Sequence, residues 1–432
     1  MNSEGKPNII FLVIDSLRAD RIFNNIKTTK IPTIDKLRKE GVYFSQTIST
    51  SDVTGTGIGC FFSGVYPFES GITETKVDST LFTLINILKK NGYKMYGSGP
   101  NFKFFQNLSN FLDNSFYYDY QQWREKDTIL GKSGKDVINH LKSIQDEPWF
   151  YYLHLMDLHG MGKLIKIPPE FDKKEFGETR YDRMVSCIDF WLNDLLKQID
   201  LDNTIIVITA DHGEYVSSKI NDLTEMPNIY KILRKMKKIN PFSEQFSEKA
   251  FRKLLKINGD TKKWILSKQL DSKEMRDLLT RSDTDELFDD VIRIPLVISG
   301  NKINSSKVIN NLIRQVDVLP TIMDLLEINY SDKITGRSLV PILNGGDLEE
   351  IPVYIETGTA QHGTSGNTIG IRTSKYKYLR NRFDEKNNIR LFDLINDPSE
   401  LKNISKKEPG LVKELEETLK KTIKNQTDFE KE

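Results

Sequence analysis

Four side chains of the kinds that bind metal ions and move protons stand at the ends of apolar stretches in this 432-residue sequence: Asp15, His159, Asp211 and His212. Carboxylate oxygens and imidazole nitrogens are both ligands of first-row divalent metals. Gly213 directly follows Asp211 and His212 and permits the tight turn that two neighbouring ligands need. The pattern therefore predicts a metal site, and the alternative for Asp15 is a cap on the helix that follows it.

The apolar stretches before these residues predict buried strands of a mostly parallel sheet. Each is nearly continuous in β-branched, leucine or aromatic residues, as in strands covered on both faces. They comprise residues 8–14, 150–156, 204–209 and 294–299. Helical patterns alternate with them, for example at residues 181–200 and 316–326. Because ligands of open α/β sheets bind beyond the carboxyl ends of the strands, we expect the four polar side chains to meet there.

A second chemical feature is the segment of residues 49–67, STSDVTGTGIGCFFSGVYP, which is dense in hydroxyl groups and glycines. A hydroxyl near a helix N-terminus lies beside free backbone N–H groups that attract an anion. This segment is therefore a candidate source of a hydroxyl nucleophile. The alternative is a flexible turn.

The composition limits the class of protein. The formal net charge is +1, with 38% hydrophobic and 28% charged residues, so we expect a packed core and no nucleic-acid or anionic-membrane partner. No stretch approaches the ~18 apolar residues of a transmembrane helix, and the first residues lack the pattern of a secretory signal. We therefore expect a cytoplasmic protein in which Cys60 and Cys187 are reduced core cysteines, with a disulfide or a reactive thiol as the alternative.

Two regions differ from the alternating pattern. Residues 220–283, approximately, are rich in Lys and Arg with helical apolar spacing, which predicts a basic helical insertion. Its place after His212 suggests a lid that selects an anionic substrate or lipid headgroup, and a solvated helical hairpin is the alternative. Near the C-terminus, short strands precede a charged helix, at residues 353–356, 369–373, 376–380 and 409–424.

Nine segments of the chain resemble, in the same order, segments of sulfatases, which belong to the alkaline phosphatase superfamily. They are PNIIFLVIDSLRAD, SGVYPFESGI, LMDLHG, TADHGE, RIPLVISG, VDVLPTIMDLL, TGRSLVPIL, IRTSKYKYL and LFDLINDPSELKNI. The resemblance implies an alkaline-phosphatase-like α/β sandwich, with a large, mostly parallel central sheet flanked by helices. It also implies two units, a catalytic domain at residues 1–350 that includes the insertion, and a small C-terminal α+β subdomain at residues 351–432.

The same resemblance implies that Thr54 is the nucleophile, because it lies ten residues before the Gly of SGVYP. In sulfatases this position is a Cys or Ser that is converted to formylglycine, with Pro two and Arg four residues later. Here those positions are Thr56 and Ile58, and threonine cannot yield the aldehyde because its carbinol carbon bears a methyl group. In this respect the sequence looks like the phosphodiesterases and phosphotransferases of the superfamily, which keep an unmodified Thr.

For the metal, the resemblance implies one divalent ion bound by four residues: Asp15, Thr54, Asp211 and His212. Sulfatases usually place two adjacent Asp after the first strand, and here the second position is Ser16. The remaining ligands mix nitrogen and oxygen, which favours Mn²⁺ or Zn²⁺, with Mg²⁺ next, over an all-oxygen Ca²⁺ site. His154, inside a predicted strand, is expected to be a core histidine with satisfied hydrogen bonds.

We expect a metal-dependent hydrolase or transferase in which Thr54 attacks a phosphate or sulfate ester and His159 protonates the leaving alkoxide. Arg18, Lys219 and His362 are candidates to contact the substrate, a small-molecule, glycan or lipid-headgroup ester. Formylglycine releases sulfate by elimination through its second hydroxyl, which threonine lacks, so phosphoesters, including phosphodiesters, are favoured. The alternatives are a sulfuric ester hydrolase that acts without formylglycine and a catalytically inactive binding protein with the sulfatase fold.

Overall fold

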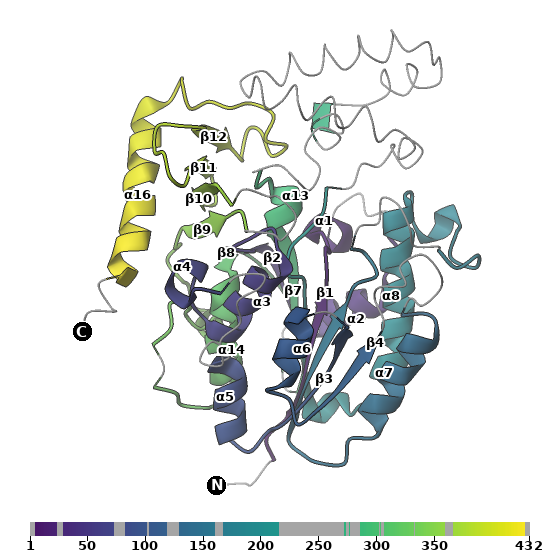
Figure 1. Cartoon of the computed structure of the whole chain (residues 1–432). Coiled ribbons are helices and arrows are strands. Elements are labelled where there is room, and N and C mark those ends of the chain that lie inside the picture. The colour runs from purple at the N-terminus through teal and green to yellow at the C-terminus, as the bar shows by residue number, and fades with distance from the viewer. Residues whose placement is uncertain are drawn as a thin grey trace.

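The computed structural model describes residues 5–23, 29–72, 83–101, 103–118, 129–159, 167–215, 272–273, 276, 286–301, 303, 306–331, 333–358 and 366–427. Within these residues an eight-stranded sheet runs through the larger part of the molecule, and a four-stranded sheet with one long helix lies beside it (Figure 1). None of the helices in these ranges is both long and apolar enough to cross a membrane.

The central sheet has the strand order β4-β3-β5-β1-β6-β7-β2-β8. Strand β7 is antiparallel to both of its neighbours, and the other pairings are parallel. The strands are β1 (Asn8–Ile14), β2 (Val42–Ile48), β3 (Lys94–Pro100), β4 (Asn114–Tyr118), β5 (Trp149–Leu155), β6 (Thr204–Thr209), β7 (Arg293–Gly300) and β8 (Lys307–Arg314). Because β5, β1 and β6 are parallel neighbours, their carboxyl ends lie at one edge of the sheet.

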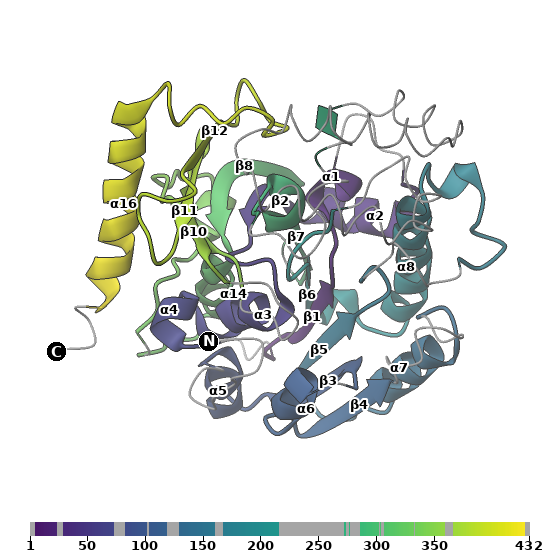
Figure 2. The ribbon, with the colours of Figure 1, turned by 45° about the horizontal axis from the view of Figure 1, so that its top comes forward.

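Helices cover both faces of the central sheet (Figure 2). One face is covered by α2 (Pro32–Glu40), α7 (Lys132–Lys142) and α8 (Arg180–Leu196). The other is covered by α3 (Thr54–Ser63), α5 (Thr83–Lys90), α6 (Lys103–Ser109) and α14 (Val318–Leu325). Short helices join these elements: α1 (Ala19–Ile22), α4 (Pro67–Ser70), α13 (Asp289–Ile292) and α15 (Val340–Leu343).

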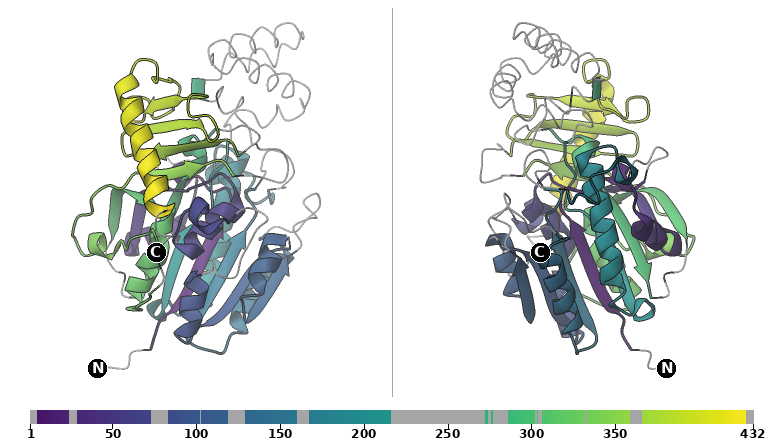
Figure 3. Two further views of the ribbon diagram at one scale, coloured as in Figure 1. Left: turned by 60° about the vertical axis from the view of Figure 1, so that its left-hand side comes forward. Right: turned by 90° about the vertical axis from the view of Figure 1, so that its right-hand side faces the viewer.

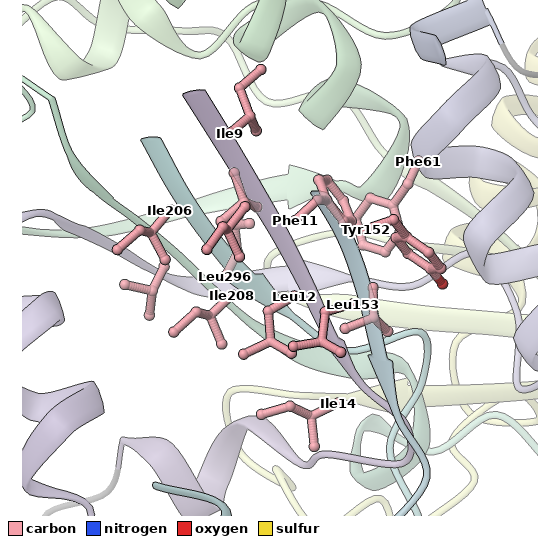
Figure 4. Close-up of a cluster of buried hydrophobic side chains, with 14 of the residues drawn as sticks. Ile9, Phe11, Leu12, Ile14, Phe61, Tyr152, Leu153, Ile206, Ile208 and Leu296 are labelled. Atoms are coloured by element: carbon pink, nitrogen blue, oxygen red, sulfur yellow. The ribbon is translucent and has the colours of Figure 1, made fainter. Parts of the chain in front are cut away.

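The core between β1 and α3 ties the first strand to the hydroxyl-rich segment. Every residue of β1 is buried. Phe11 of β1 packs edge-on against Phe61 of α3, with ring centroids 5.4 Å apart, and Tyr152 of β5 lies beside both (Figure 4). Buried aromatic pairs of this kind contribute both apolar area and a preferred ring geometry. They fix the position of α3, which begins at Thr54, relative to the strand that ends before Asp15.

The second sheet is antiparallel, in the order β12-β11-β10-β9. Its elements are β9 (Val353–Glu356), β10 (Thr368–Arg372), β11 (Tyr376–Asn381) and β12 (Arg390–Asp393), with α16 (Pro409–Thr427) packed against them (Figure 3). The N–H of Glu356 in β9 donates to the carbonyl of Thr50 at 2.8 Å. The C-terminal sheet therefore supports the segment that leads into α3.

The predicted fold class is confirmed: a mostly parallel central sheet between helices, with a small antiparallel sheet at the C-terminus. Strands β1, β6 and β9 begin and end at the predicted residues. The helix predicted at residues 181–200 ends early, at Leu196, and the side chain of Asp200 caps a separate short turn at Leu201–Asn203. The domain division at residue 350 stays a prediction, and most of the basic insertion at about 220–283 lies outside the described residues.

Candidate metal centre and nucleophile

The parallel strand ends bring two of the predicted metal ligands together. Asp15 follows β1, and its backbone N–H donates to the carbonyl of Leu155 at the end of β5 (2.9 Å). Asp211 follows β6, and both carboxylates are completely buried. Two buried carboxylates are costly to ionise unless positive charge lies close by. This edge of the sheet is therefore electrostatically suited to a cation.

Asp15 accepts hydrogen bonds from three side chains. Its Oδ1 accepts from Oγ of Ser16 (2.6 Å) and from Nδ1 of His159 (3.0 Å). Its Oδ2 accepts from Oγ1 of Thr54 at 3.2 Å. The structure thus brings the predicted nucleophile and the predicted acid to the same carboxylate.

Ser16 connects the two carboxylates through its backbone. Its φ of 62° lies in the left-handed region, which is uncommon for a residue with a side chain. This turn directs the N–H of Ser16 to Oδ1 of Asp211 (3.2 Å), which also accepts from the N–H of His212 (2.8 Å). Oδ2 of Asp211 is buried and has no hydrogen-bond partner among the residues that the structure describes. One carboxylate oxygen is therefore held by the backbone while the other is left for a ligand.

His154 belongs to this group, and the prediction that it is a satisfied core histidine is wrong. The side chain is completely buried, and its Nε2 has no hydrogen-bond partner in the described part of the chain. Nε2 lies 3.6 Å from Oδ2 of Asp15, which is too long for a hydrogen bond. One ligand atom each from Asp15, His154 and Asp211 lie within 4.8 Å of one another. Side chains of a strand alternate between its two faces, so the sequence of β5 could have predicted that His154 lies on the same face as Tyr152, toward α3.

His212 lies next to the cluster with one ring nitrogen engaged. Its Nδ1 donates to the carbonyl of Gly213 at 2.8 Å, which leaves the lone pair on Nε2, 3.6 Å from Oδ2 of Asp211. Burial alone would lower the pKa of His212, but the charges of Asp211 and Asp15 raise it to about 9. The imidazole therefore experiences the strongly negative potential that a bound cation would experience.

The charges of this cluster also shift the pKa values of Asp15 and His159. Burial alone would raise the pKa of Asp15, but the charge of His159, the nearby imidazole of His154 and the hydrogen bond from His159 hold it well below its ordinary value. For His159, burial lowers the pKa and the charge of Asp15 more than reverses this, so that the net shift is upward. A protonated His159 is the form that a general acid requires.

Thr54 is the first residue of α3 and is 6% exposed. The first N–H groups of a helix have no acceptor within the helix and favour negative charge. Glycines let this end of α3 approach the metal ligands closely, since a Cβ on Gly57 would lie 2.8 Å from the carbonyl oxygen of Asp211. That carbonyl also accepts from Oγ of Ser49 (2.7 Å) and Nε2 of Gln315 (3.3 Å). Neither supporting residue was singled out by the sequence, because their contacts are long-range.

Arg18, a predicted substrate contact, is buried. Its side chain is 2% exposed, and its guanidinium bonds to Asp20 and Asp290 and to the carbonyl of Glu214. These bonds occupy much of the guanidinium. A substrate-contacting role for Arg18 stays a prediction. The other two predicted substrate contacts, Lys219 and His362, lie outside the described residues.

The donor set fits a divalent cation. Two carboxylates and the imidazole of His154 converge, with His212 beside Asp211, and buried atoms of Asp211 and His154 lack partners within the described ranges. Native proteins pair nearly all such atoms, so a set of adjacent exceptions points to a missing ligand. Carboxylate oxygen with imidazole nitrogen suits Mn²⁺, Zn²⁺ or Mg²⁺.

The chain belongs to the sulfatase family and is therefore an ester hydrolase of the alkaline phosphatase superfamily. The family model "Sulfatase" matches residues 7–328, and the model "N-sulphoglucosamine sulphohydrolase, C-terminal" matches residues 281–428. Arylsulfatase K of Xenopus laevis is 22% identical over 97% of this chain and 82% of its own length. An ulvan-active sulfatase of Formosa agariphila is 22% identical over 92% of this chain and 77% of its own.

Solved structures share the fold at lower identity. The phosphonate monoester hydrolase of Agrobacterium radiobacter has a TM-score of 0.70 and 15% identity, covering 97% of this chain and 96% of that protein. A protein solved with its substrate D-glucosamine-2-N,6-O-disulfate has a TM-score of 0.66 and 17% identity, covering 98% of both chains. Such low identities establish the architecture, while the substrate must be argued from the site.

Proposed function

We propose that this protein hydrolyses sulfate esters, with Thr54 as an unmodified nucleophile and a sulfated carbohydrate as the substrate class. The observation that carries the proposal is the position of Oγ1 of Thr54, 3.2 Å from a buried carboxylate that also contacts His159. The relatives named sulfatases support the sulfate ester, as does the neighbour solved with a sulfated sugar. This shifts the balance from the phosphoester that the threonine alone favoured.

The residues divide into holding and reacting groups. Asp15, His154, Asp211 and His212 would hold the cation, which would lower the pKa of the Thr54 hydroxyl and offset the charge of the sulfate. Oγ1 of Thr54, whose proton has passed to solvent, attacks sulfur, and the bond from sulfur to the ester oxygen breaks. His159, whose side chain is 37% exposed and so within reach of a substrate, protonates the departing alcohol oxygen. Water then attacks sulfur, the bond to Oγ1 breaks, and His159 takes up the proton as sulfate leaves.

A phosphoester substrate is the second candidate, and Thr54 itself favours it. Threonine carries one hydroxyl on its reacting carbon, so the covalent intermediate must be released by a second displacement at sulfur or phosphorus. Such double displacement is ordinary chemistry for a phosphoryl group. The fold shared with a phosphonate monoester hydrolase is compatible with this substrate.

Parallel assays of the full chain with Mn²⁺ or Zn²⁺ separate the two candidates. The substrates are an aryl sulfate, a bis-aryl phosphodiester and an aryl phosphonate, each with wild type, Thr54→Ala and Thr54→Ser. We expect turnover of the aryl sulfate that Thr54→Ala abolishes and Thr54→Ser partly retains, with an intact mass that excludes formylglycine. Turnover of the phosphorus esters alone would favour the second candidate. Full activity of Thr54→Ala, or no turnover of any ester, would overturn the proposed mechanism.

A further inference from the structure

We propose that His154 is a ligand of the cation, that Tyr152 is the positioning residue that orients it, and that this pair makes the site select Zn²⁺ and Mn²⁺ over Ca²⁺. The inference deepens the proposed function and rests only on its cation-binding part, because it involves neither the nucleophile nor the ester.

The first observation is the buried nitrogen of His154. Its side chain has 0% exposure, and Nε2 has no hydrogen-bond partner among the described residues. An unsatisfied buried polar atom loses its hydration without compensation, so proteins seldom keep one without a reason. Oδ2 of Asp211 is unsatisfied in the same way. With Asp15, these residues place three ligand atoms within 4.8 Å of one another. A cation satisfies all of them at once.

The second observation is the contact on the other ring nitrogen. The hydroxyl oxygen of Tyr152 lies 2.8 Å from Nδ1 of His154, and Tyr152 is itself buried. A neutral imidazole carries one hydrogen, so Nε2 can offer a lone pair only when Nδ1 holds that hydrogen. In the cation-bound state Nδ1–H therefore donates to the oxygen of Tyr152. This is the arrangement in which a second residue fixes the tautomer and direction of a ligating histidine.

The third observation is that neighbouring residues restrain both the backbone and the ring of His154. The hydroxyl of Tyr118 donates to the backbone carbonyl of His154 at 2.6 Å. The ring of Phe105 packs edge-on against the imidazole, with centroids 4.6 Å apart. The ring thus has little freedom to turn Nε2 away from Asp15. The orientation required for a ligand is already built into β5 and its neighbours.

Metal selectivity follows from the donor types. Ca²⁺ prefers six to eight oxygen ligands, whereas Zn²⁺ and Mn²⁺ accept imidazole. At the position after Asp15 the chain has Ser16, whose Oγ donates to Oδ1 of Asp15 and so adds no carboxylate. His154 and His212 instead supply two nitrogens. Removing His154 should therefore weaken Zn²⁺ and Mn²⁺ binding more than Ca²⁺ binding.

The chain offers matched controls on the opposite face of the same strand. Tyr151 directly precedes Tyr152, and its hydroxyl lies 2.6 Å from Oγ of Ser98 and 2.9 Å from Nδ1 of His140. This is a second tyrosine–histidine pair, between β5 and α7, and in the described part of the chain no carboxylate hydrogen-bonds to it. Tyr151→Phe and His140→Ala therefore remove the same groups without touching the proposed site.

The experiment is calorimetric titration of the metal-free full chain with Zn²⁺, Mn²⁺ and Ca²⁺ separately. We expect Tyr152→Phe to weaken Zn²⁺ binding about 10- to 100-fold, and His154→Ala or the bulkier His154→Gln to weaken it further. Tyr151→Phe and His140→Ala should bind as wild type, and circular dichroism should show all variants folded. Wild-type affinity in Tyr152→Phe and His154→Gln would overturn the inference, as would a wild type that binds none of these ions.

The outcomes also separate this inference from the proposed function. If the variants lose metal affinity while the wild type hydrolyses no ester, the ligand assignment stands and the proposed function fails. If the wild type hydrolyses aryl sulfate while His154→Gln and Tyr152→Phe bind Zn²⁺ as wild type, the function stands and the ligand assignment fails.

Discussion

Two buried charged clusters lie next to each other at the carboxyl edge of the central sheet, and they differ in how their charges are compensated. In the first, the cation cluster of Asp15, His154, Asp211 and His212, buried atoms lack partners within the described residues. In the second, the ion-pair cluster, Asp290 contacts three cationic side chains: Arg18, Lys273 and Arg276. The N–H of Gly213, just after the first cluster, donates to the carbonyl of Val291 in the second (2.6 Å).

This contrast distinguishes a binding site from its support. A buried carboxylate whose charge is matched by protein cations needs nothing further, and removing its charge leaves those cations uncompensated. Asp15 and Asp211 face histidines instead of Arg or Lys, and an imidazole can give up its proton when an external cation binds. The ion-pair cluster therefore holds the strand ends in place, and we expect the proposed cation site to depend on that rigidity.

The largest effect should come from removing Asp211, a proposed ligand whose Oδ2 has no hydrogen-bond partner among the described residues. Asp211→Ala should lower turnover of the aryl sulfate at saturating metal by about 10²–10³-fold or more, because the charge stabilisation of the transition state is lost. The matched control is Asp182→Ala, since Asp182 is also completely buried but caps α8. Steady-state kinetics at a temperature where both variants are folded make the comparison. An equal loss in Asp182→Ala would mean that the effect is structural.

The free energy of unfolding should be more sensitive to substitution of Asp290 than of Asp211. Asp290→Asn should lower the free energy of unfolding of the metal-free protein by about 3–5 kcal/mol, because Arg18 and Arg276 lose their buried counter-charge. Asp211→Asn should leave it unchanged or raise it, because one of two neighbouring buried negative charges disappears. Urea unfolding in the presence of a chelator measures both. Equal destabilisation by the two substitutions would contradict the distinction between the clusters.

The smallest of the three effects is a loss of stability at acid pH that arises from the ion-pair cluster. Burial alone would raise the pKa of Asp290, but Arg18, Lys273 and Arg276 hold it well below its ordinary value. Because the unfolded value is about 3.9, the stabilisation is fully present above about pH 5 and is lost as the pH falls through the folded value. Melting temperatures measured across this range should fall toward acid in wild type and less steeply in Asp290→Asn. Parallel curves would contradict the assignment.

The sequence predicted the strands that carry the site better than the other residues that complete it. Strands β1 and β6 are continuous apolar runs, so their ends, and with them Asp15 and Asp211, were predictable. The unsatisfied nitrogen of His154 was not predicted because it follows from the contacts of His154 with Tyr152, Asp15 and Phe105, of which Asp15 and Phe105 are distant in the sequence. The burial of Arg18 likewise depends on Asp290, a residue 272 positions away. Residues that complete a site through distant partners leave little local signal in a sequence.

Anomalous diffraction from crystals grown with Mn²⁺ or Zn²⁺ tests most directly whether one ion joins these strand ends. We expect a single strong peak within bonding distance of Asp15, Asp211 and Nε2 of His154, beside His212 and the hydroxyl of Thr54. A peak bound by other residues, or none at full metal saturation, would contradict it.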